Sequence, residues 1–350
     1  MAVTGTGAPP DWQAVPLPWQ TALWQRAGAW LQSGRLPHAL LLTGVAGSGK
    51  QLFASAFAAL ALCRQPADGQ ACGQCPSCRQ FAAGVHPDYH FVTIPEDKTA
   101  ILVDQIRALG ATLALTSLHG GRKIAVLSPA DAMNSNAANS LLKTLEEPAP
   151  GTLLLLVSAQ AAHLAATVRS RCQKLAMTTP SVPDALAWLN GVESRSDWPA
   201  LLGIAGGGPL LALQLAPLRL VRERLDLYRM LAELRSNTRN PLQSAAELAR
   251  EPLPLVLRLL QTWVMDLVCM ATSGQAAPAA LINADARSQL QSALPGLHLR
   301  ALHAYLGRLN RAVMLAATPV NGQLLLEDLL LQWADGLQCL NAAPLAAAGG

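Results

Sequence analysis

The stretch Ala39-Leu-Leu-Leu-Thr43, followed at once by Gly44-Val-Ala-Gly47-Ser-Gly49-Lys50, decides the fold that this sequence predicts. Its first part is a short apolar run that is typical of a buried strand. Its second part matches the G-x-x-x-x-G-K body of a phosphate-binding loop, and an alanine-rich helical segment follows at Gln51–Cys63. In such a loop, glycines turn backbone amides toward phosphate oxygens and the lysine reaches the outer phosphates. The candidate phosphate-binding residues are Gly44, Gly47, Gly49 and Lys50.

Strand-like and helix-like segments alternate around this loop as far as about residue 176. Apolar runs at 123–127 and 152–157 predict buried strands, and patterns near 89–93 and 172–175 predict two more. Residues with helical spacing separate these strands, at 19–31, 102–115 and 134–145. Alternating strands and helices indicate a parallel sheet that helices cover on both faces.

Beyond residues 179–183 the strand patterns stop, and helical patterns follow one another to the end. Breaks are expected at Gly206–Pro209 and Thr272–Pro278, and a last strong helix at Gln323–Leu340. Hydrophobic residues make up 51% of the 350 residues and charged residues 14%, so large cores can be buried. The predicted fold class is therefore α/β plus all-α, in two or three domains.

The chain carries no clear targeting or membrane signal. Met1–Asp11 has neither the basic nor the apolar region of a secretion signal. The apolar segment Leu253–Met270 carries Arg258, Gln261 and Asp266, so an amphipathic or buried helix is expected there. The net charge of +4 permits contact with nucleic acid or an acidic partner without requiring either. We expect a cytoplasmic protein with no membrane partner.

The phosphate loop is intact only in part. Ser or Thr should follow the lysine to ligate magnesium, but Gln51 stands there. An acidic pair should end the strand at 123–127, but Ser128-Pro129 ends it, and Asp131 is interpreted as a helix-start residue too far along to replace the pair. The sequence therefore lacks the residues for hydrolysis in cis. It leaves three roles open for the loop: nucleotide (ATP or ADP) binding, anion binding without hydrolysis, or a structural turn.

Four of the seven cysteines are clustered, at Cys63, Cys72, Cys75 and Cys78. Two-residue gaps suit turns that converge on a tetrahedral ion, and four sulfur ligands leave no open position for catalysis. An odd cysteine count argues for a reducing compartment, which disfavours two disulfides. Structural Zn²⁺ is the prediction, and an iron–sulfur cluster is the alternative. Because few basic residues lie nearby, we interpret the module as a staple.

The segment Val168-Arg-Ser170-Arg171-Cys172 comes just before the last predicted strand. An arginine at a rim is ordinarily a solvated charge. A chain that cannot hydrolyse ATP can nevertheless lend an arginine to a neighbour's ATP, where such a finger is worth about 10³–10⁵ in rate.

Together these elements resemble the bacterial clamp-loader family, the AAA+ proteins that serve DNA polymerase III. The most specific stretch is Asn136-Ala-Ala-Asn139-Ser-Leu-Leu-Lys143-Thr-Leu-Glu146-Glu147-Pro148. His86-Pro-Asp-Tyr89 and the segment 321–331 also fit the family. The resemblance implies a RecA-like AAA+ core at 1–179 with a zinc module at about 63–80, a small helical lid at 180–215, a helical collar at 216–340 and a frayed tail at 341–350.

The resemblance also implies roles for single residues. Arg171 matches the family's Ser-Arg-Cys arginine finger, a catalytic residue in trans, and the four clustered cysteines match its zinc ligands. Three segments depart from the active-site motifs of the family's motor subunits: Lys50-Gln51 in the loop, Ser128-Pro129 after the strand, and Gly206-Gly-Gly-Pro209. The chain therefore fits the delta-prime branch. That branch implies a subunit without ATPase activity, a non-catalytic part of a DNA-directed DNA polymerase (nucleotidyltransferase) holoenzyme. Its expected partners are gamma/tau motors and delta in a hetero-pentamer, with the sliding clamp and primed DNA.

Two other functions stay open at this stage: an active ATPase, either a gamma/tau-type motor or an unrelated AAA+ enzyme, and a zinc-dependent DNA-binding module. The family signature residues Lys143, Glu146 and Glu147 have no assigned role. Because Pro148 follows them directly, we interpret them as helix-packing and capping residues.

Overall fold

The computed structural model describes residues 15–341 except 119–120, 219, 274–280, 317 and 319. The chain divides into two compact units: an α/β unit, Met1–Asp184, and a helical unit, Ala185–Gly350.

A five-stranded, wholly parallel sheet forms the centre of the α/β unit. The strand order is β2-β3-β4-β1-β5. The strands are β1 (Ala39–Thr43), β2 (Tyr89–Val92), β3 (Lys123–Leu127), β4 (Thr152–Ser158) and β5 (Gln173–Ala176). The predicted parallel sheet is therefore confirmed, and each expected strand is present to within one or two residues.

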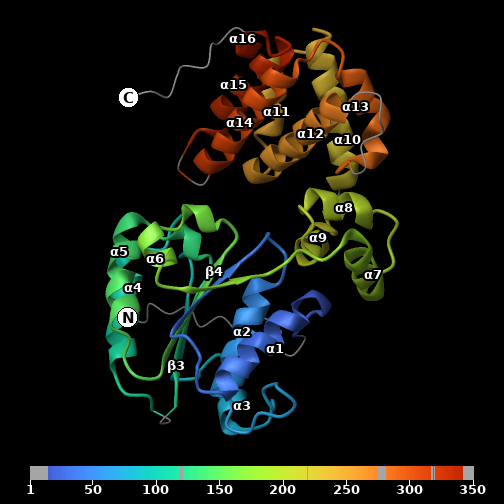
Figure 1. Cartoon of the computed structure of the whole chain (residues 1–350). Coiled ribbons are helices and arrows are strands. Elements are labelled where there is room, and N and C mark those ends of the chain that lie inside the picture. Colours follow the sequence, from blue (N-terminus) through green and yellow to red (C-terminus); the bar gives the residue numbers. More distant parts are fainter. Residues whose placement is uncertain are drawn as a thin grey trace. The chain divides into compact units, whose positions relative to one another are not determined.

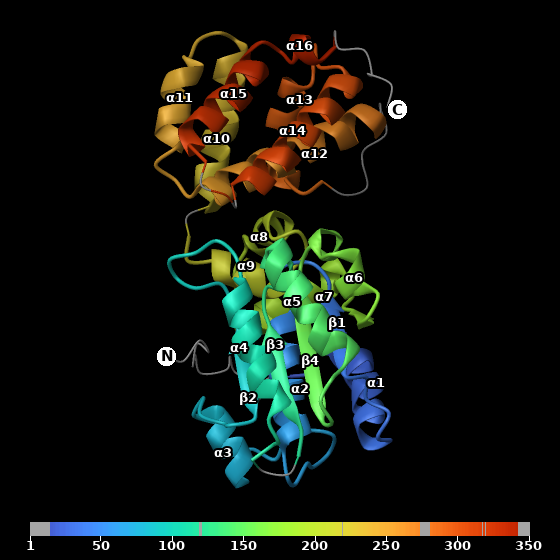
Figure 2. The same cartoon turned by 90° about the vertical axis from the view of Figure 1, so that its left-hand side faces the viewer.

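Helices cover both faces of this sheet, which explains why β1 is apolar at consecutive positions. Leu40 and Leu42 belong to a cluster on one face, with α1 (Thr21–Gln32) and α2 (Lys50–Leu62). Leu41 lies in a second cluster on the opposite face, with α4 (Val103–Ala114) and α5 (Ser135–Glu146). Figures 1 and 2 show these helix pairs on either side of the strands. Because successive strand residues point to opposite faces, a strand buried on both sides needs apolar residues throughout.

Shorter elements complete the α/β unit and lie next to several of the candidate site residues. They are α3 (Pro76–Ala82), α6 (Ala166–Arg169) and the 3₁₀ turns η2 (Pro18–Gln20), η3 (Ala130–Ala132) and η4 (Ala161–His163).

The helical unit contains two hydrophobic clusters. The first is centred on Trp198, which is fully buried, and is formed by α7 (Val182–Val192), α8 (Trp198–Ile204) and α9 (Pro209–Leu215). Gly206 and Gly207, both at positive φ, separate α8 from α9 and confirm the break predicted there. The second cluster draws on α10 (Leu220–Arg235), α11 (Pro241–Leu248), α12 (Leu253–Ser273), η5 (Ala284–Ala286), α13 (Arg287–Ala293), α14 (Leu299–Leu315), α15 (Gly322–Ala334) and α16 (Gln338–Asn341).

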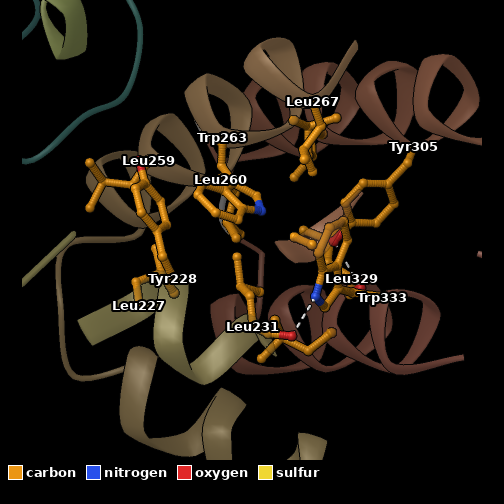
Figure 3. Close-up of a cluster of buried hydrophobic side chains, with 14 of the residues drawn as sticks. Leu227, Tyr228, Leu231, Leu259, Leu260, Trp263, Leu267, Tyr305, Leu329 and Trp333 are labelled. Carbon is orange, nitrogen blue, oxygen red and sulfur yellow. Dashed lines mark hydrogen bonds between the residues drawn. The ribbon is translucent and has the colours of Figure 1, made fainter. Parts of the chain in front are cut away.

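Four aromatic side chains, Tyr228, Trp263, Tyr305 and Trp333, lie among the leucines of the second cluster (Figure 3), and three of them hydrogen-bond their polar atom. The rings of Tyr228 and Trp263 stack with centroids 4.0 Å apart. Trp333 Nε1 donates to Leu231 O at 2.9 Å, and the Tyr305 hydroxyl donates to a carbonyl of α15 at 3.0 Å. These bonds let large, partly polar rings be buried, since a buried polar atom without a partner is costly.

α12 is the buried or amphipathic helix expected at Leu253–Met270. By length and composition alone it could cross a membrane, but 56% of its apolar window is buried inside the helical unit.

The single helix expected at Gln323–Leu340 is wrong. α15 ends at Ala334, and Gly336 and Leu337 adopt positive φ before α16 begins. A left-handed pair ends a helix because it turns the backbone out of the helical path. The division of the helical residues into a lid and a collar stays a prediction, as does the core boundary at 179. The tail expected after Asn341 and the segment Met1–Asp11, where no secretion signal is expected, lie outside the described residues.

Candidate functional site

The phosphate-loop sequence adopts a turn that only glycine can make at its first position. Gly44 follows β1 with φ +151°, and a Cβ there would lie 2.7 Å from Met177 O. Gly49 stands at φ 85° as the N-cap of α2, which begins at Lys50. The loop therefore leads from a buried strand into a helix N-terminus, as the sequence predicts.

The Lys50 side chain hydrogen-bonds to the phosphate loop itself. Its Nζ donates to Gly44 O at 2.9 Å and to Val45 O at 2.7 Å, and the residue is only 6% exposed. Burial lowers the pKa of this amine to about 8, although the charge of Asp131 opposes the shift. The lysine amine is therefore hydrogen-bonded to the backbone carbonyls of the phosphate loop.

A glutamine and a tryptophan that the sequence reasoning missed hold the loop from outside. Gln20 is fully buried, and its Nε2 donates to Ser48 O at 3.0 Å and to Gly49 O at 3.1 Å. Trp19 Nε1 donates to the same Ser48 O at 3.0 Å. In the sequence, Gln20 stands out only as a polar residue within an apolar helical pattern. Because glutamine is usually exposed, that position does not predict a buried contact with the loop.

The two positions that depart from the ATPase pattern meet in space. Ser128, just after β3, donates from Oγ to Gln51 Oε1 at 3.3 Å, although the two residues are 77 positions apart. A neutral hydrogen-bonded pair thus occupies the region where an ATPase places its magnesium ligand and its acid.

Asp131 lies closer to the loop than its place in the sequence suggests. It is in η3, which agrees with a helix-start role, but its charge reaches Lys50. Among the described residues, its Oδ1 is buried without a hydrogen-bond partner. The helix-start role expected for Asp131 agrees with its place in η3, and its failure to replace the acidic pair stays a prediction.

The four clustered cysteines converge as predicted. The Sγ atoms of Cys63, Cys72, Cys75 and Cys78 all lie within 4.8 Å of one another. The Cys63–Cys75 and Cys72–Cys78 sulfur pairs are each 4.0 Å apart. A tetrahedral ion with sulfur ligands at about 2.3 Å needs sulfur–sulfur distances of about 3.8 Å. The cluster therefore fits a metal ion after small shifts.

Backbone amides prepare some of these thiols to act as thiolates. Burial alone would raise the pKa of the Cys75 thiol, but amides of Cys78 and Arg64 help to lower it to about 6. Burial raises the pKa of the Cys63 and Cys78 thiols. Metal binding would therefore release protons from the last two.

The cysteine segment is attached to the sheet through α3. Ser77 Oγ donates to Leu62 O at 2.7 Å and lies 2.9 Å from His86 Nε2. His86 Nδ1 accepts from the Asp88 amide at 3.1 Å, so its proton is on Nε2 and that atom donates to Ser77. Phe81 packs on Tyr89 of β2, with ring centroids 4.6 Å apart. The His86–Tyr89 motif thus joins the cysteine segment to the sheet.

Arg171 lies on the surface of the α/β unit, between α6 and β5, with its side chain 38% exposed. Its Nη1 donates to Thr167 O at 3.0 Å, and its Nη2 lies 2.6 Å from Glu146 Oε1. Glu146 therefore has an ion-pair partner, which the sequence reasoning did not foresee. Lys143 is exposed on α5, and Glu147 is the exposed C-cap residue, whose amide donates to Lys143 O at 3.0 Å.

Comparisons with known proteins agree with this architecture. A family model described as "DNA polymerase III, delta subunit" matches residues 19–181, and one described as "DNA polymerase III, delta subunit, C terminal" matches residues 219–335. The chain is 37% identical to DNA polymerase III subunit delta' of Pseudomonas aeruginosa, over 91% of this chain and 97% of that protein. It is 32% identical to the Escherichia coli subunit of the same name, over 92% and 96%.

Among solved structures, a gamma subunit-related protein of DNA polymerase III from Thermotoga maritima aligns with 90% of this chain and 99% of its own. The identity is 13% and the TM-score 0.39, so this likeness adds nothing to the assignment.

The parallel sheet, the phosphate loop after β1 and the helices on both faces define a P-loop protein of the AAA+ type. Within that class, the length and identity of the sequence matches decide the family. The chain belongs to the DNA polymerase III delta-prime family.

Proposed function

We propose that this chain is a non-hydrolysing subunit of the DNA polymerase III clamp loader that lends Arg171 to ATP on a neighbouring subunit. The hydrogen bond between Gln51 and Ser128 carries the first half of this proposal. An ATPase needs a hydroxyl on magnesium and an acid at these two places, and an amide and an alcohol supply no negative charge there.

The state of Lys50 supports the same conclusion. Both hydrogen bonds of its amine go to loop carbonyls, and burial reduces its tendency to stay charged. An incoming triphosphate would have to break these bonds without the gain of an ordered magnesium ion. The loop therefore serves as a structural turn at the carboxyl end of β1.

Arg171 supports the second half of the proposal. A guanidinium can stabilise charge on a transferring phosphoryl group only if a neighbouring protein can approach it. The Arg171 side chain is 38% exposed and is held on a short, well-anchored segment. It can therefore enter an ATP site on an adjoining subunit.

The four-cysteine cluster holds Zn²⁺ in this proposal. Four thiolates close the coordination sphere, which gives the ion a structural role and leaves no position for water or substrate. The ion ties the end of α2 to α3 and so shapes one end of the α/β unit.

The remaining parts of the proposal concern partners. The chain would join gamma/tau motors and delta in a hetero-pentamer, through the helical residues 216–340, in the bacterial cytoplasm. Through that assembly it would help to load the sliding clamp on primed DNA.

A gamma/tau-type motor is the second candidate, and the position of Asp131 favours it. This acid has an unpartnered buried oxygen and its charge reaches Lys50. If Asp131 held magnesium, it would replace one of the two acids that hydrolysis by the chain itself requires.

Magnesium-dependent ATP turnover by the purified chain separates the two candidates. We expect no turnover above that of a Lys50→Met variant. Turnover near about 1 s⁻¹, in the usual range for enzymes, and lost in both Lys50→Met and Asp131→Asn, would refute the non-hydrolysing assignment.

A further inference from the structure

The Arg171 guanidinium is held at two points in the isolated chain. Nη1 donates to Thr167 O at 3.0 Å, one turn earlier in its own segment. Nη2 forms an ion pair at 2.6 Å with Glu146 Oε1, which comes from a different helix. Neither contact hides the side chain, which stays 38% exposed.

The helix that carries Glu146 is fixed at this end. Leu145, the residue before it, is 2% exposed, and its carbonyl lies 3.0 Å from His38 Nε2. Because a carbonyl can only accept, His38 donates this bond. His38 directly precedes β1, and its own carbonyl accepts from Leu154 of β4 at 2.7 Å. The end of α5 is therefore bonded to the centre of the sheet.

The segment that carries Arg171 is fixed to the same strand. The Arg171 amide donates to the carbonyl of Val168, a residue with no exposed surface. Two residues later, Gln173 of β5 stands opposite Leu40 of β1. Glu146 is therefore held through His38, the residue before β1, and Arg171 is held through β5, which pairs with β1. The helices α5 and α6 also pack against each other.

We propose that Glu146 is a positioning residue for Arg171: it sets the direction in which the guanidinium leaves the surface. This inference rests on the proposed function of Arg171 as an arginine finger. An exposed arginine has many rotamers, and correct orientation before reaction is a large part of phosphoryl-transfer catalysis. A carboxylate on a rigid support restricts those rotamers, and Nη1 and Nη2 each keep a second N–H that can donate to a phosphate.

The test is a double-mutant cycle in the complete clamp loader, assembled from this chain and its partner subunits. The ATPase is measured with clamp and primed DNA for the wild type, Glu146→Gln, Arg171→Ala and the double variant. Glu147→Gln is the matched control, because it removes the same charge from the next residue, which has no ion pair with Arg171. Glu146→Asp tests whether a shorter carboxylate keeps part of the ATPase activity that Glu146→Gln loses.

We expect Glu146→Gln to lower kcat about two- to fivefold, the range that an exposed ion pair can supply. The KM for ATP and the yield of assembled loader should not change, and Glu147→Gln should match the wild type. In the Arg171→Ala background, Glu146→Gln should have no further effect, because the two residues act as one unit.

The outcomes separate this inference from the proposed function. If Arg171→Ala leaves kcat unchanged, the finger role fails and Glu146 has nothing to position. If Arg171→Ala lowers kcat but Glu146→Gln does not, only the positioning role is overturned. An increase in kcat in Glu146→Gln, or a loss that persists unchanged in the Arg171→Ala background, overturns it as well.

Discussion

Replacing Cys75 by serine should remove the metal while leaving the start of α3 in place. Cys75 is 6% exposed and is the N-cap of α3, where its sulfur accepts from the Cys78 amide. Serine is among the best N-cap residues, so the helix keeps its cap. A neutral hydroxyl is a poor zinc ligand, so one of the four coordination bonds is lost.

The size of the effect follows from the closed geometry of the site. Structural zinc sites show about 10–16 kcal/mol of apparent binding free energy, so one ligand in four accounts for about 3 kcal/mol. That loss weakens zinc binding by about a hundredfold. The fold of the α/β unit should survive, because Ser77 still bonds to Leu62 and Phe81 still packs on Tyr89.

Metal analysis after dialysis against a chelator, combined with hydrogen exchange, tests this expectation. The wild type should retain one zinc per chain, and Cys75→Ser should lose it together with amide protection in residues 63–75, while α3 keeps its protection. Amides of β1 and β3 should be unaffected. Cys172→Ser, a change at a half-buried cysteine outside the cluster, should retain the zinc. A Cys75→Ser protein that still carries one zinc per chain refutes the assigned ligand set.

Two further predictions concern stability. The pKa of Lys50 is about 8 when folded and 10.5 when unfolded, so the unfolded chain binds more protons between these values. The free energy of unfolding should therefore rise by up to about 3 kcal/mol from pH 8 to 10.5, and urea titrations of Lys50→Met should lack this rise. Arg224 is fully buried and contacts Asn283 and Asp285, so Arg224→Met should lower the free energy of unfolding by about 3 kcal/mol. The exposed control Arg229→Met should change it by less than about 1 kcal/mol, and equal losses in both variants would contradict the role of burial.

The strands and the phosphate loop could be predicted because their signals are local. β1, β3 and β4 are uninterrupted apolar runs, and a strand buried on both faces has no other pattern available. The cysteine cluster could also be predicted, since the spacing of its ligands within one short segment is itself the signal. The end of α15 could not, because Leu337 at positive φ is a conformation that leucine rarely adopts.

The contacts that explain the site could not be predicted because they join distant parts of the chain. Gln51 and Ser128 each appear in the sequence only as a departure from a pattern, and their hydrogen bond depends on the order of the strands. Glu146 belongs to a recognisable stretch, but its partner became visible only once α5 and α6 were packed together.

The role of Arg171 is tested most directly by the ATPase rate of a reconstituted loader in which this chain carries Arg171→Ala. The matched control is Arg169→Ala, an exposed arginine two residues earlier. Arg171→Ala should lower kcat by abolishing turnover at the site that Arg171 completes, where a finger contributes about 10³–10⁵, while Arg169→Ala should match the wild type. Equal rates for the Arg171→Ala loader and the wild type would contradict the finger role.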